Sequence, residues 1–373
     1  MPKLVALDLP GGELFVSHLQ RVWEQGDAIL PLDQRLPLKI RRELVSTMGA
    51  SLVLSADSEQ KFSGRSVEAG DALIVTTSGT GGIPKGVVLT HEAVAASAQM
   101  TSQSLSVNYL TDRWLCCLPV SHIGGLSVVT RALITGTELE IHGQFDAGEC
   151  ENSARSGVSL VSLVVTAMQR IDVSLFRKIL VGGSSLPVGL PENVIATYGM
   201  TETGSGIIYD GFPLPDVQLR IQNGEILVKS PTLFRCYRNS EAPIDTDGWF
   251  RTGDGGVLNA DGKLSVFGRL EEVIVSGGEK IWPIIVEEAL ESLPWIDEAA
   301  VVGRPDHEWG EKVTAFLIVD NQKNSLSLDE LRDQLGLLLP RYALPRSFHI
   351  VDRLPKTTSG KIRKKDLLPI TPA

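Results

Sequence analysis

The densest group of chemically useful side chains lies in the segment TTSGTGGIPKGV, from Thr76 to Val87. Four hydroxyl residues and three glycines precede one lysine, and the segment follows an apolar run typical of a buried strand. Hydroxyls and the backbone N–H groups of a glycine-rich turn donate hydrogen bonds to phosphate oxygens, and a lysine adds positive charge. The segment therefore predicts a nucleotide phosphate loop, with contacts from Thr77, Ser78, Gly79, Thr80, Gly82 and Lys85.

This loop is not of the Walker A type. Pro84 precedes the lysine where that motif has glycine, and Gly86 follows it where that motif has Ser or Thr. A flexible surface linker is the alternative interpretation of such a composition. We favour a phosphate loop, because Pro-Lys-Gly closes the segment directly behind a buried strand.

The elements around the loop indicate an α/β domain. From Met1 to about Gly268, apolar runs such as Ala72–Thr76 and Val161–Thr166 alternate with helical stretches. Behind the loop, Thr90 is placed to cap a helix, with Glu92 in its first turn, where a negative charge is favoured. Strand, glycine loop, strand and helix follow one another.

After Arg269 the pattern changes to a smaller α+β unit. Pro283 is suited to the first position of a helix, and Ser327 with Glu330 forms a capping box for a helix that we expect to end at Pro340. Strands are expected at 299–302 and 313–319. The fold class is therefore α/β, with a large N-terminal domain at 1–268 and a mobile C-terminal domain at 269–373, joined at 268–272.

Composition limits the class of protein. Hydrophobic residues make up 43% of the chain and charged residues 21%, as in ordinary globular proteins. The net charge of -10 argues against a protein that neutralises nucleic-acid phosphates. The four cysteines have no metal-ligand spacing, and we find neither a signal peptide nor an apolar run of about 20 residues. We expect a cytoplasmic enzyme without a membrane span; its oligomeric state is open, a homo-oligomer included.

Six more motifs accompany the phosphate loop in a fixed order. They are LPVSHIGGL at Leu118, VGGSSLP at Val181, YGMTET at Tyr198, DGWFRTGD at Asp247, GRLEEVIVSGGEKIWP at Gly268 and PKTTSGKIRKKDL at Pro355. With them the chain resembles the adenylate-forming superfamily of acyl-CoA synthetases, adenylation domains and luciferases. The resemblance implies an ATP-dependent ligase that activates a carboxylic acid as an acyl-adenylate, with Mg²⁺ as cofactor and coenzyme A as co-substrate.

The resemblance assigns the nucleotide contacts of YGMTET. It implies that Tyr198, with Gly199, lies against adenine, that Thr201 contacts the α-phosphate and that Glu202 binds Mg²⁺. One carboxylate with phosphate oxygens suits this cation. A solvated surface carboxylate is the alternative for Glu202. Gly183, in VGGSSLP, is a further predicted contact.

Two residues resemble the family's ribose contacts. Asp254 offers two acceptor oxygens to the ribose hydroxyls, and Arg269 is its implied partner on the nucleotide. Without the resemblance, Thr252–Asp254 would be interpreted as a turn and Arg269 as a surface charge.

Lys361 resembles the family's mobile catalytic lysine. A carboxylate and an α-phosphate about 4 Å apart repel each other by about 4 kcal/mol at an effective dielectric near 20, so a cation is needed between them. Thr201 and His122 join Lys361 as catalytic candidates. We interpret Arg363, Lys364 and Lys365 as a solvated basic tail.

The family carries out its two half-reactions with the small domain in two orientations. The resemblance places the hinge at Glu271, where relatives usually have Asp or Lys. It also implies that Val275–Lys280 lines the pantetheine tunnel, which makes Lys280 a coenzyme A contact. Gly81 is another departure, at a position where many relatives have a hydroxyl residue.

The phosphate loop begins much earlier than in most relatives, so part of the usual N-terminal subdomain is expected to be missing or shortened. This compactness resembles the o-succinylbenzoate–CoA ligases of menaquinone and phylloquinone biosynthesis. Arg131 would bind the second carboxylate of that acid, unless it faces water at a helix end. His122 would border the acyl pocket, unless it is a packed core histidine, and Thr203 is a further predicted substrate contact.

Three alternatives remain at this point. A related acyl-CoA synthetase would take a short-chain, aryl or fatty acid. An adenylation domain would load a separate carrier protein. A degenerate nucleotide-binding protein would have no need of Lys361 together with Glu202, Asp254 and Arg269.

Overall fold

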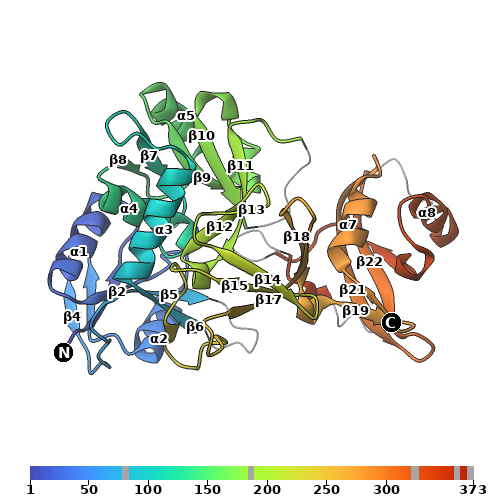
Figure 1. Cartoon of the computed structure of the whole chain (residues 1–373), viewed down its shortest axis with the longest axis horizontal. Helices are drawn as coiled ribbons and strands as arrows, with labels where there is room; N and C mark the ends of the chain where they lie inside the picture. The colour runs from blue at the N-terminus through green and yellow to red at the C-terminus, as the bar shows by residue number, and fades with distance from the viewer. Residues whose placement is uncertain (78–83, 184–188, 321–326, 357–361, 368–373) are drawn as a thin grey trace. The chain divides into compact units, whose positions relative to one another are not determined.

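The structure, a computed structural model, describes residues 1–77, 84–183, 189–320, 327–356 and 362–367 (Figure 1). The chain forms two compact units, and the predicted α/β class with a larger N-terminal and a smaller C-terminal part is confirmed. Unit 1 contains Met1–Leu219, Val228–Phe250 and Ala260–Lys263, and unit 2 contains Arg220–Leu227, Arg251–Asn259 and Leu264–Ala373. These units differ from the predicted ranges 1–268 and 269–373 in short segments between 220 and 268, and a swivel at that boundary stays a prediction.

The first sheet of unit 1 has the strand order β16-β6-β5-β2-β1-β3-β4. Its strands are β1 Leu4–Asp8, β2 Ala28–Pro31, β3 Leu52–Ser55, β4 Glu59–Lys61, β5 Asp71–Thr77, β6 Lys85–Thr90 and β16 Cys236–Tyr237. β1 runs parallel to β2 and β3, and β2 runs parallel to β5, so the carboxyl ends of these strands share one edge. β6 returns antiparallel to β5.

The second sheet of unit 1 has the strand order β13-β12-β11-β10-β9-β7-β8. Its strands are β7 Arg113–Cys116, β8 Glu138–Ile141, β9 Leu160–Val164, β10 Lys178–Gly182, β11 Val194–Met200, β12 Ser205–Tyr209 and β13 Phe212–Pro213. β7 to β11 are parallel, which explains their apolar runs, because a parallel sheet is covered on both faces.

The helices of unit 1 fit the sequence pattern. They are α1 Glu13–Glu24, α2 Leu38–Met48, α3 His91–Ser104, α4 Ile123–Thr135, α5 Ala147–Arg155, α6 Val165–Met168, and the 3-10 turns η1 Val173–Leu175 and η2 Thr201–Thr203. The predicted cap of α3 is confirmed, since Thr90 Oγ1 accepts a hydrogen bond from Ala93 N at 3.1 Å. α3 contacts β5 and β6 of the first sheet, β12 of the second sheet, and α4.

A four-stranded sheet lies mostly in unit 2, in the order β14-β15-β17-β18. Its strands are β14 Gln218–Gln222, β15 Glu225–Lys229, β17 Phe250–Leu258 and β18 Leu264–Arg269. β17 and β18 are antiparallel neighbours, with Asp254 opposite Arg269. The strand β18 leads directly into the turn η3, Leu270–Glu272.

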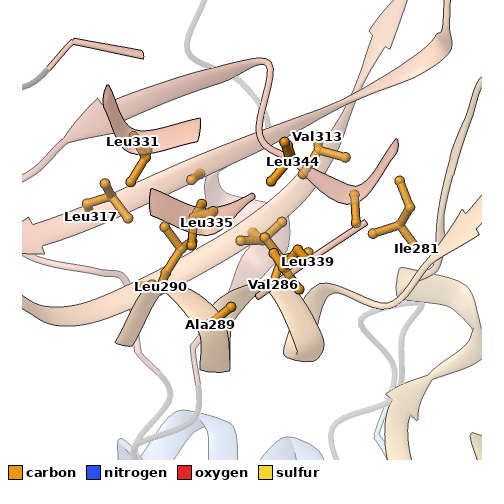
Figure 2. Close-up of a cluster of buried hydrophobic side chains, with 14 of the residues drawn as sticks. Ile281, Val286, Ala289, Leu290, Val313, Leu317, Leu331, Leu335, Leu339 and Leu344 are labelled. Carbon is orange, nitrogen blue, oxygen red and sulfur yellow. The ribbon is translucent and has the colours of Figure 1, made fainter. Parts of the chain in front are cut away.

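The rest of unit 2 is built on the long β21–β22 hairpin, in a five-stranded sheet of order β20-β19-β22-β21 with β23 beside β22. The elements are β19 Ile274–Ser276, β20 Glu279–Ile281, α7 Pro283–Glu291, β21 Ile296–Asp306, β22 Gly310–Val319, α8 Leu328–Leu335, η4 Arg341–Ala343, β23 Ser347–Ile350 and η5 Lys364–Leu367. Val286 and Leu290 from α7 and Leu331 and Leu335 from α8 pack with Leu317 in one buried core (Figure 2). Unit 2 therefore has a hydrophobic core of its own.

The local predictions of helix and strand ends are confirmed with two exceptions, one in each unit. Pro283 opens α7, and the capping box of Ser327 and Glu330 is present. The helix α8 ends at Leu335, however, and not at Pro340. The other exception is in unit 1, where the predicted strand 161–166 ends at Val164 and continues as the helix α6. No helix of the described residues is both long and apolar enough to cross a membrane.

Candidate active site

The predicted unit 1 site residues follow the carboxyl ends of parallel strands. Thr77 ends β5, Gly183 follows β10 with a φ of 95°, and Tyr198 lies near the end of β11. His122 comes after β7, as the N-cap residue of α4. Ligands of open α/β sheets bind at such edges, so sheet topology alone brings these segments to the edges where a ligand is expected.

The phosphate loop connects two paired strands. Thr77 at the end of β5 lies opposite Lys85 at the start of β6, so the loop is closed at its base. The predicted contacts Ser78, Gly79, Thr80 and Gly82 lie outside the described residues. Lys85 is described, and its Nζ lies 4.8 Å from the ring centroid of Tyr237.

The YGMTET segment makes a sharp turn from β11 into η2. The strand register shifts between Tyr198 and Gly199, and a Cβ on Gly199 would lie 2.1 Å from the carbonyl oxygen of Ser205. Only glycine fits at that position. Thr201 opens η2 and is half-buried, while Thr203 is fully buried.

The hydroxyl of Thr203 stabilises the turn itself. It accepts a hydrogen bond from Met200 N at 2.8 Å and lies 2.7 Å from the carbonyl oxygen of Ser205. These backbone contacts give the side chain a structural role, and its predicted contact with the substrate stays a prediction.

Glu202 is held by a tyrosine that the sequence did not single out. The hydroxyl of Tyr237 donates a hydrogen bond to Glu202 Oε1 at 2.9 Å. Within the described ranges, no group of three His, Cys, Asp or Glu residues could hold a metal ion alone. A single carboxylate that shares Mg²⁺ with nucleotide phosphates fits Glu202, because Mg²⁺ takes few protein ligands and keeps oxygens from substrate or water.

His122 belongs to a small polar cluster. Its Nε2 lies 2.7 Å from Arg35 Nη2 and 3.3 Å from Asp33 Oδ2. Burial opposes the ionisation of Asp33, but the hydrogen bonds from Arg35 outweigh it and lower the pKa of Asp33. The imidazole is 45% exposed, so the alternative of a packed core histidine is wrong.

Arg131 is buried within α4, with 2% of its surface exposed. The alternative of a helix-end arginine facing water is therefore wrong. Its guanidinium stacks on Trp114 at 4.7 Å, and its Nε and Nη1 have no hydrogen-bond partner among the described residues. Burial lowers the pKa of Arg131, because a covered guanidinium loses its hydration.

In unit 2 the structure brings together the two predicted ribose residues. Arg269 Nε lies 3.1 Å from Asp254 Oδ1, and Arg269 Nη1 donates to the carbonyl oxygen of Thr252 at 3.0 Å. Thr252 Oγ1 in turn accepts from Asp254 N at 3.0 Å. The carboxylate of Asp254 is 9% exposed, so its position is well defined by these contacts.

The remaining predicted residues of unit 2 are placed as follows. Glu271 is exposed in η3, and Lys280 is exposed in β20, opposite Val275. Lys361 lies outside the described residues. The interpretation of Lys364 as part of a solvated tail is wrong, because its Nζ lies 2.8 Å from Glu287 Oε1 and 3.3 Å from Glu272 Oε2.

Two site residues, Asp33 and Tyr237, were not predicted from the sequence, and only one of them has a recognisable sequence signal. Asp33 lies two residues after the end of the buried strand β2, and a carboxylate in that position is a recognisable signal. Tyr237 has no such signal, since it lies 35 residues after Glu202 and belongs to a two-residue strand.

Two family models match the chain. An AMP-binding enzyme model matches residues 55–238, and an AMP-binding enzyme C-terminal domain model matches residues 285–361. The 2-succinylbenzoate–CoA ligase of Enterococcus faecalis is 35% identical over 82% of this chain and 71% of that relative. A probable 2-succinylbenzoate–CoA ligase of Mycobacterium tuberculosis is 33% identical over 97% of both chains.

Solved structures agree with these relatives. The o-succinylbenzoate CoA synthetase of Bacillus subtilis in complex with the acyl-adenylate intermediate OSB-AMP superimposes with a TM-score of 0.85 and 28% identity. That match covers 98% of this chain and 88% of the other. A structure of the same synthetase with ATP and a magnesium ion also has a TM-score of 0.85 at 28% identity, covering 98% of this chain and 89% of the other. The chain therefore belongs to the adenylate-forming family of AMP-binding enzymes.

Proposed function

We propose that this chain is an ATP-dependent 2-succinylbenzoate–CoA ligase. It converts 2-succinylbenzoate, ATP and coenzyme A to 2-succinylbenzoyl-CoA, AMP and diphosphate. A carboxylate oxygen attacks the α-phosphorus of ATP and diphosphate leaves. The thiol of coenzyme A then attacks the acyl carbon, and AMP leaves with the former carboxylate oxygen.

Arg131 is the observation that carries the choice of acid. A buried guanidinium is costly when two of its nitrogens have no partner among the described residues, and a carboxylate would relieve that cost by accepting their hydrogen bonds. 2-Succinylbenzoate has two carboxylates, of which one is activated and the other keeps its charge. Relatives named as 2-succinylbenzoate–CoA ligases support the same choice.

The nucleotide contacts of the proposed enzyme come from separate segments. Thr77, Lys85 and the loop residues Ser78, Gly79, Thr80 and Gly82 bind phosphates. Tyr198 and Gly199 contact adenine, Gly183 is a further nucleotide contact, and Asp254 with Arg269 contacts the ribose. Glu202 binds Mg²⁺, which offsets the charge of the phosphates when it is bound.

Lys361, Thr201 and His122 act on the reacting groups. Lys361 and Thr201 stabilise the α-phosphate as negative charge develops on it. His122, oriented by Asp33 and Arg35, borders the acyl group, with Thr203 as a further contact.

A swivel at Glu271, between domains 1–268 and 269–373, separates the two half-reactions, and Lys280 contacts coenzyme A. The product serves menaquinone or phylloquinone biosynthesis in the cytoplasm. The enzyme's partners are the acid, ATP and coenzyme A, and we assign it no nucleic-acid partner.

The test is AMP release across a panel of acids, each assayed with and without coenzyme A. The panel contains 2-succinylbenzoate, benzoate, a short-chain acid and a fatty acid. We expect release that depends on coenzyme A, with kcat/KM highest for 2-succinylbenzoate. An equal response to all four acids, or a preference for a mono-acid, would refute the substrate.

A further inference from the structure

One aromatic side chain lies between the two charged groups on which the phosphate site depends. Tyr237 is 8% exposed; its hydroxyl bonds to Glu202 Oε1, and its ring lies beneath Lys85 Nζ. The two distances are 2.9 Å to the carboxylate oxygen and 4.8 Å from the ammonium to the ring centroid. Tyr237 thus contacts the predicted metal ligand and the predicted phosphate ligand at once.

These contacts keep two opposite charges apart. In the described part of the chain, Lys85 forms no ion pair with Glu202; both interact with Tyr237 instead. The hydroxyl occupies one acceptor site of the carboxylate and leaves Oε2 for a cation. The ring face attracts the ammonium without neutralising it, so its positive charge stays available to phosphate oxygens.

The backbone fixes Tyr237 against both partners. Its strand β16 pairs with β6, with Tyr237 opposite Val87, two residues beyond Lys85. Phe234 N donates to the carbonyl oxygen of Glu202 at 2.8 Å, so the same segment also holds the backbone of the metal ligand. The segment 234–238 therefore bridges the end of the phosphate loop and the YGMTET turn.

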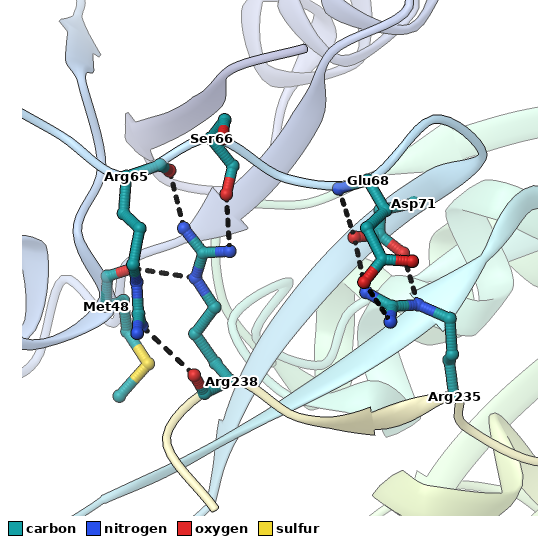
Figure 3. A network of polar contacts seen from close by, with 7 residues as sticks. All are labelled: Met48, Arg65, Ser66, Glu68, Asp71, Arg235 and Arg238. Atoms are coloured by element: carbon teal, nitrogen blue, oxygen red, sulfur yellow. Dashed lines mark hydrogen bonds and ion pairs between the residues drawn. The ribbon is translucent and has the colours of Figure 1, made fainter. Parts of the chain in front are cut away.

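Two arginines anchor this segment on either side of the tyrosine (Figure 3). Arg235 makes two parallel hydrogen bonds of 2.9 Å to the buried carboxylate of Asp71. Arg238 Nε donates to the carbonyl oxygen of Met48 at 3.1 Å, and its Nη1 donates to that of Ser66 at 2.8 Å. A guanidinium with several fixed acceptors has little freedom, so the position of the tyrosine between them is well defined.

We infer that Tyr237 is a positioning residue for the adenylation half-reaction, which orients Glu202 for Mg²⁺ and holds Lys85 apart from it for phosphate. The inference rests on the proposed function of Glu202 and Lys85. Tyr237 acts through these two side chains, whose charged groups it contacts. Removing its hydroxyl should therefore raise the Mg²⁺ concentration that adenylation requires.

The test compares Tyr237→Phe with Tyr109→Phe, the same change at a tyrosine that is 63% exposed. ATP–diphosphate exchange is measured against Mg²⁺ concentration, and thioester formation is measured from supplied acyl-adenylate. Tyr237→Phe should raise the half-saturating Mg²⁺ concentration about tenfold, since hydrogen bonds to charged groups are the strong ones, and should leave thioester formation within about twofold. Tyr109→Phe should change neither.

Three outcomes decide the inference. An unchanged Mg²⁺ requirement in Tyr237→Phe overturns it, and so does an equal loss of both half-reactions with a lower melting temperature, since that is a structural effect. The variant Glu202→Gln distinguishes a failure of this inference from a failure of the proposed Mg²⁺ binding by Glu202. If that variant raises the Mg²⁺ requirement while Tyr237→Phe does not, only the inference fails. If neither variant changes the requirement, the assignment of Glu202 fails as well.

Discussion

Asp254 and Arg269 lie opposite each other on the neighbouring strands β17 and β18, with Arg269 Nε 3.1 Å from Asp254 Oδ1. The ion pair with Arg269 compensates the burial of the Asp254 carboxylate and holds it in one orientation. Arg269 also bonds to the carbonyl oxygen of Thr252, so the guanidinium is fixed by two contacts from the same strand. The arrangement presents a preorganised acceptor, which is the form that a ribose contact requires.

Asp254→Asn tests the ribose contact directly. The amide keeps the shape but loses the charge, so KM for ATP should rise about tenfold or more. The native enzyme should prefer ATP over 2′,3′-dideoxy-ATP, and the variant should lose most of that preference. Asp261→Asn, a change in an exposed turn, is the control. An undiminished preference in Asp254→Asn would show that the carboxylate does not contact the ribose.

Lys361→Ala should remove adenylation while sparing thioester formation from supplied acyl-adenylate. The lysine offsets charge that develops only as the carboxylate meets the α-phosphate, so its loss should slow that step by about 10² to 10³-fold. Lys365→Ala, at an exposed residue, is the control. Equal losses in both half-reactions would show that Lys361 has another role.

The variant Arg131→Leu should lose activity and keep its stability. Loss of the charge should lower kcat/KM for 2-succinylbenzoate by about 10²-fold. The melting temperature should change little, because the variant also removes two buried donors without partners among the described residues.

Arg177→Leu is the matched comparison for Arg131. Arg177 makes two hydrogen bonds to the buried carboxylate of Asp112, at 2.9 and 2.6 Å. Its loss should cost about 3 kcal/mol of stability and leave the activity of the folded protein intact. If Arg131→Leu instead loses stability and keeps its activity, Arg131 is a structural residue.

We expect the variant Lys364→Met to lose stability in a pH-dependent way. Burial raises the pKa of Glu287, and Lys364 opposes that rise, so the variant should raise the pKa further. A group whose folded pKa lies above its unfolded value stabilises the fold at low pH and loses that contribution as pH rises through the folded pKa. The variant should therefore be close to the native protein near pH 4 and lose about 3 kcal/mol at pH 8.

Chemical unfolding followed at both pH values measures this difference. Arg363→Met, which removes an exposed pair with Asp366, is the control and should cost less than about 1 kcal/mol at either pH. An equal loss for Lys364→Met at pH 4 and pH 8 would contradict the buried pairing with Glu287.

Most of the fold could be predicted, because its elements carry local signals. The cap at Thr90, the proline at the start of α7 and the capping box at Ser327 each depend on a few adjacent residues. The end of α8 was missed, although Gly336, which directly follows Leu335, is of a type common at helix ends.

The site residues, too, differ in whether their signals are local. Residues in recognisable motifs, such as Glu202 and Asp254, could be named as candidates from the sequence. Tyr237 and Asp33 could not be paired with Glu202 and His122, since those contacts depend on how distant strands are aligned. Lys364 looked like a solvated cation because its partner, Glu287, is buried in a helix 77 residues earlier.

The central claim is that the carboxylate of the acid becomes bonded to the α-phosphorus of ATP. The most direct measurement is transfer of ¹⁸O from carboxylate-labelled 2-succinylbenzoate during a complete reaction with ATP and coenzyme A. One labelled oxygen of the activated carboxylate should appear in the phosphate of AMP and the other in the thioester carbonyl, while diphosphate stays unlabelled. Label in free phosphate together with ADP would indicate an acyl phosphate, and would contradict the account.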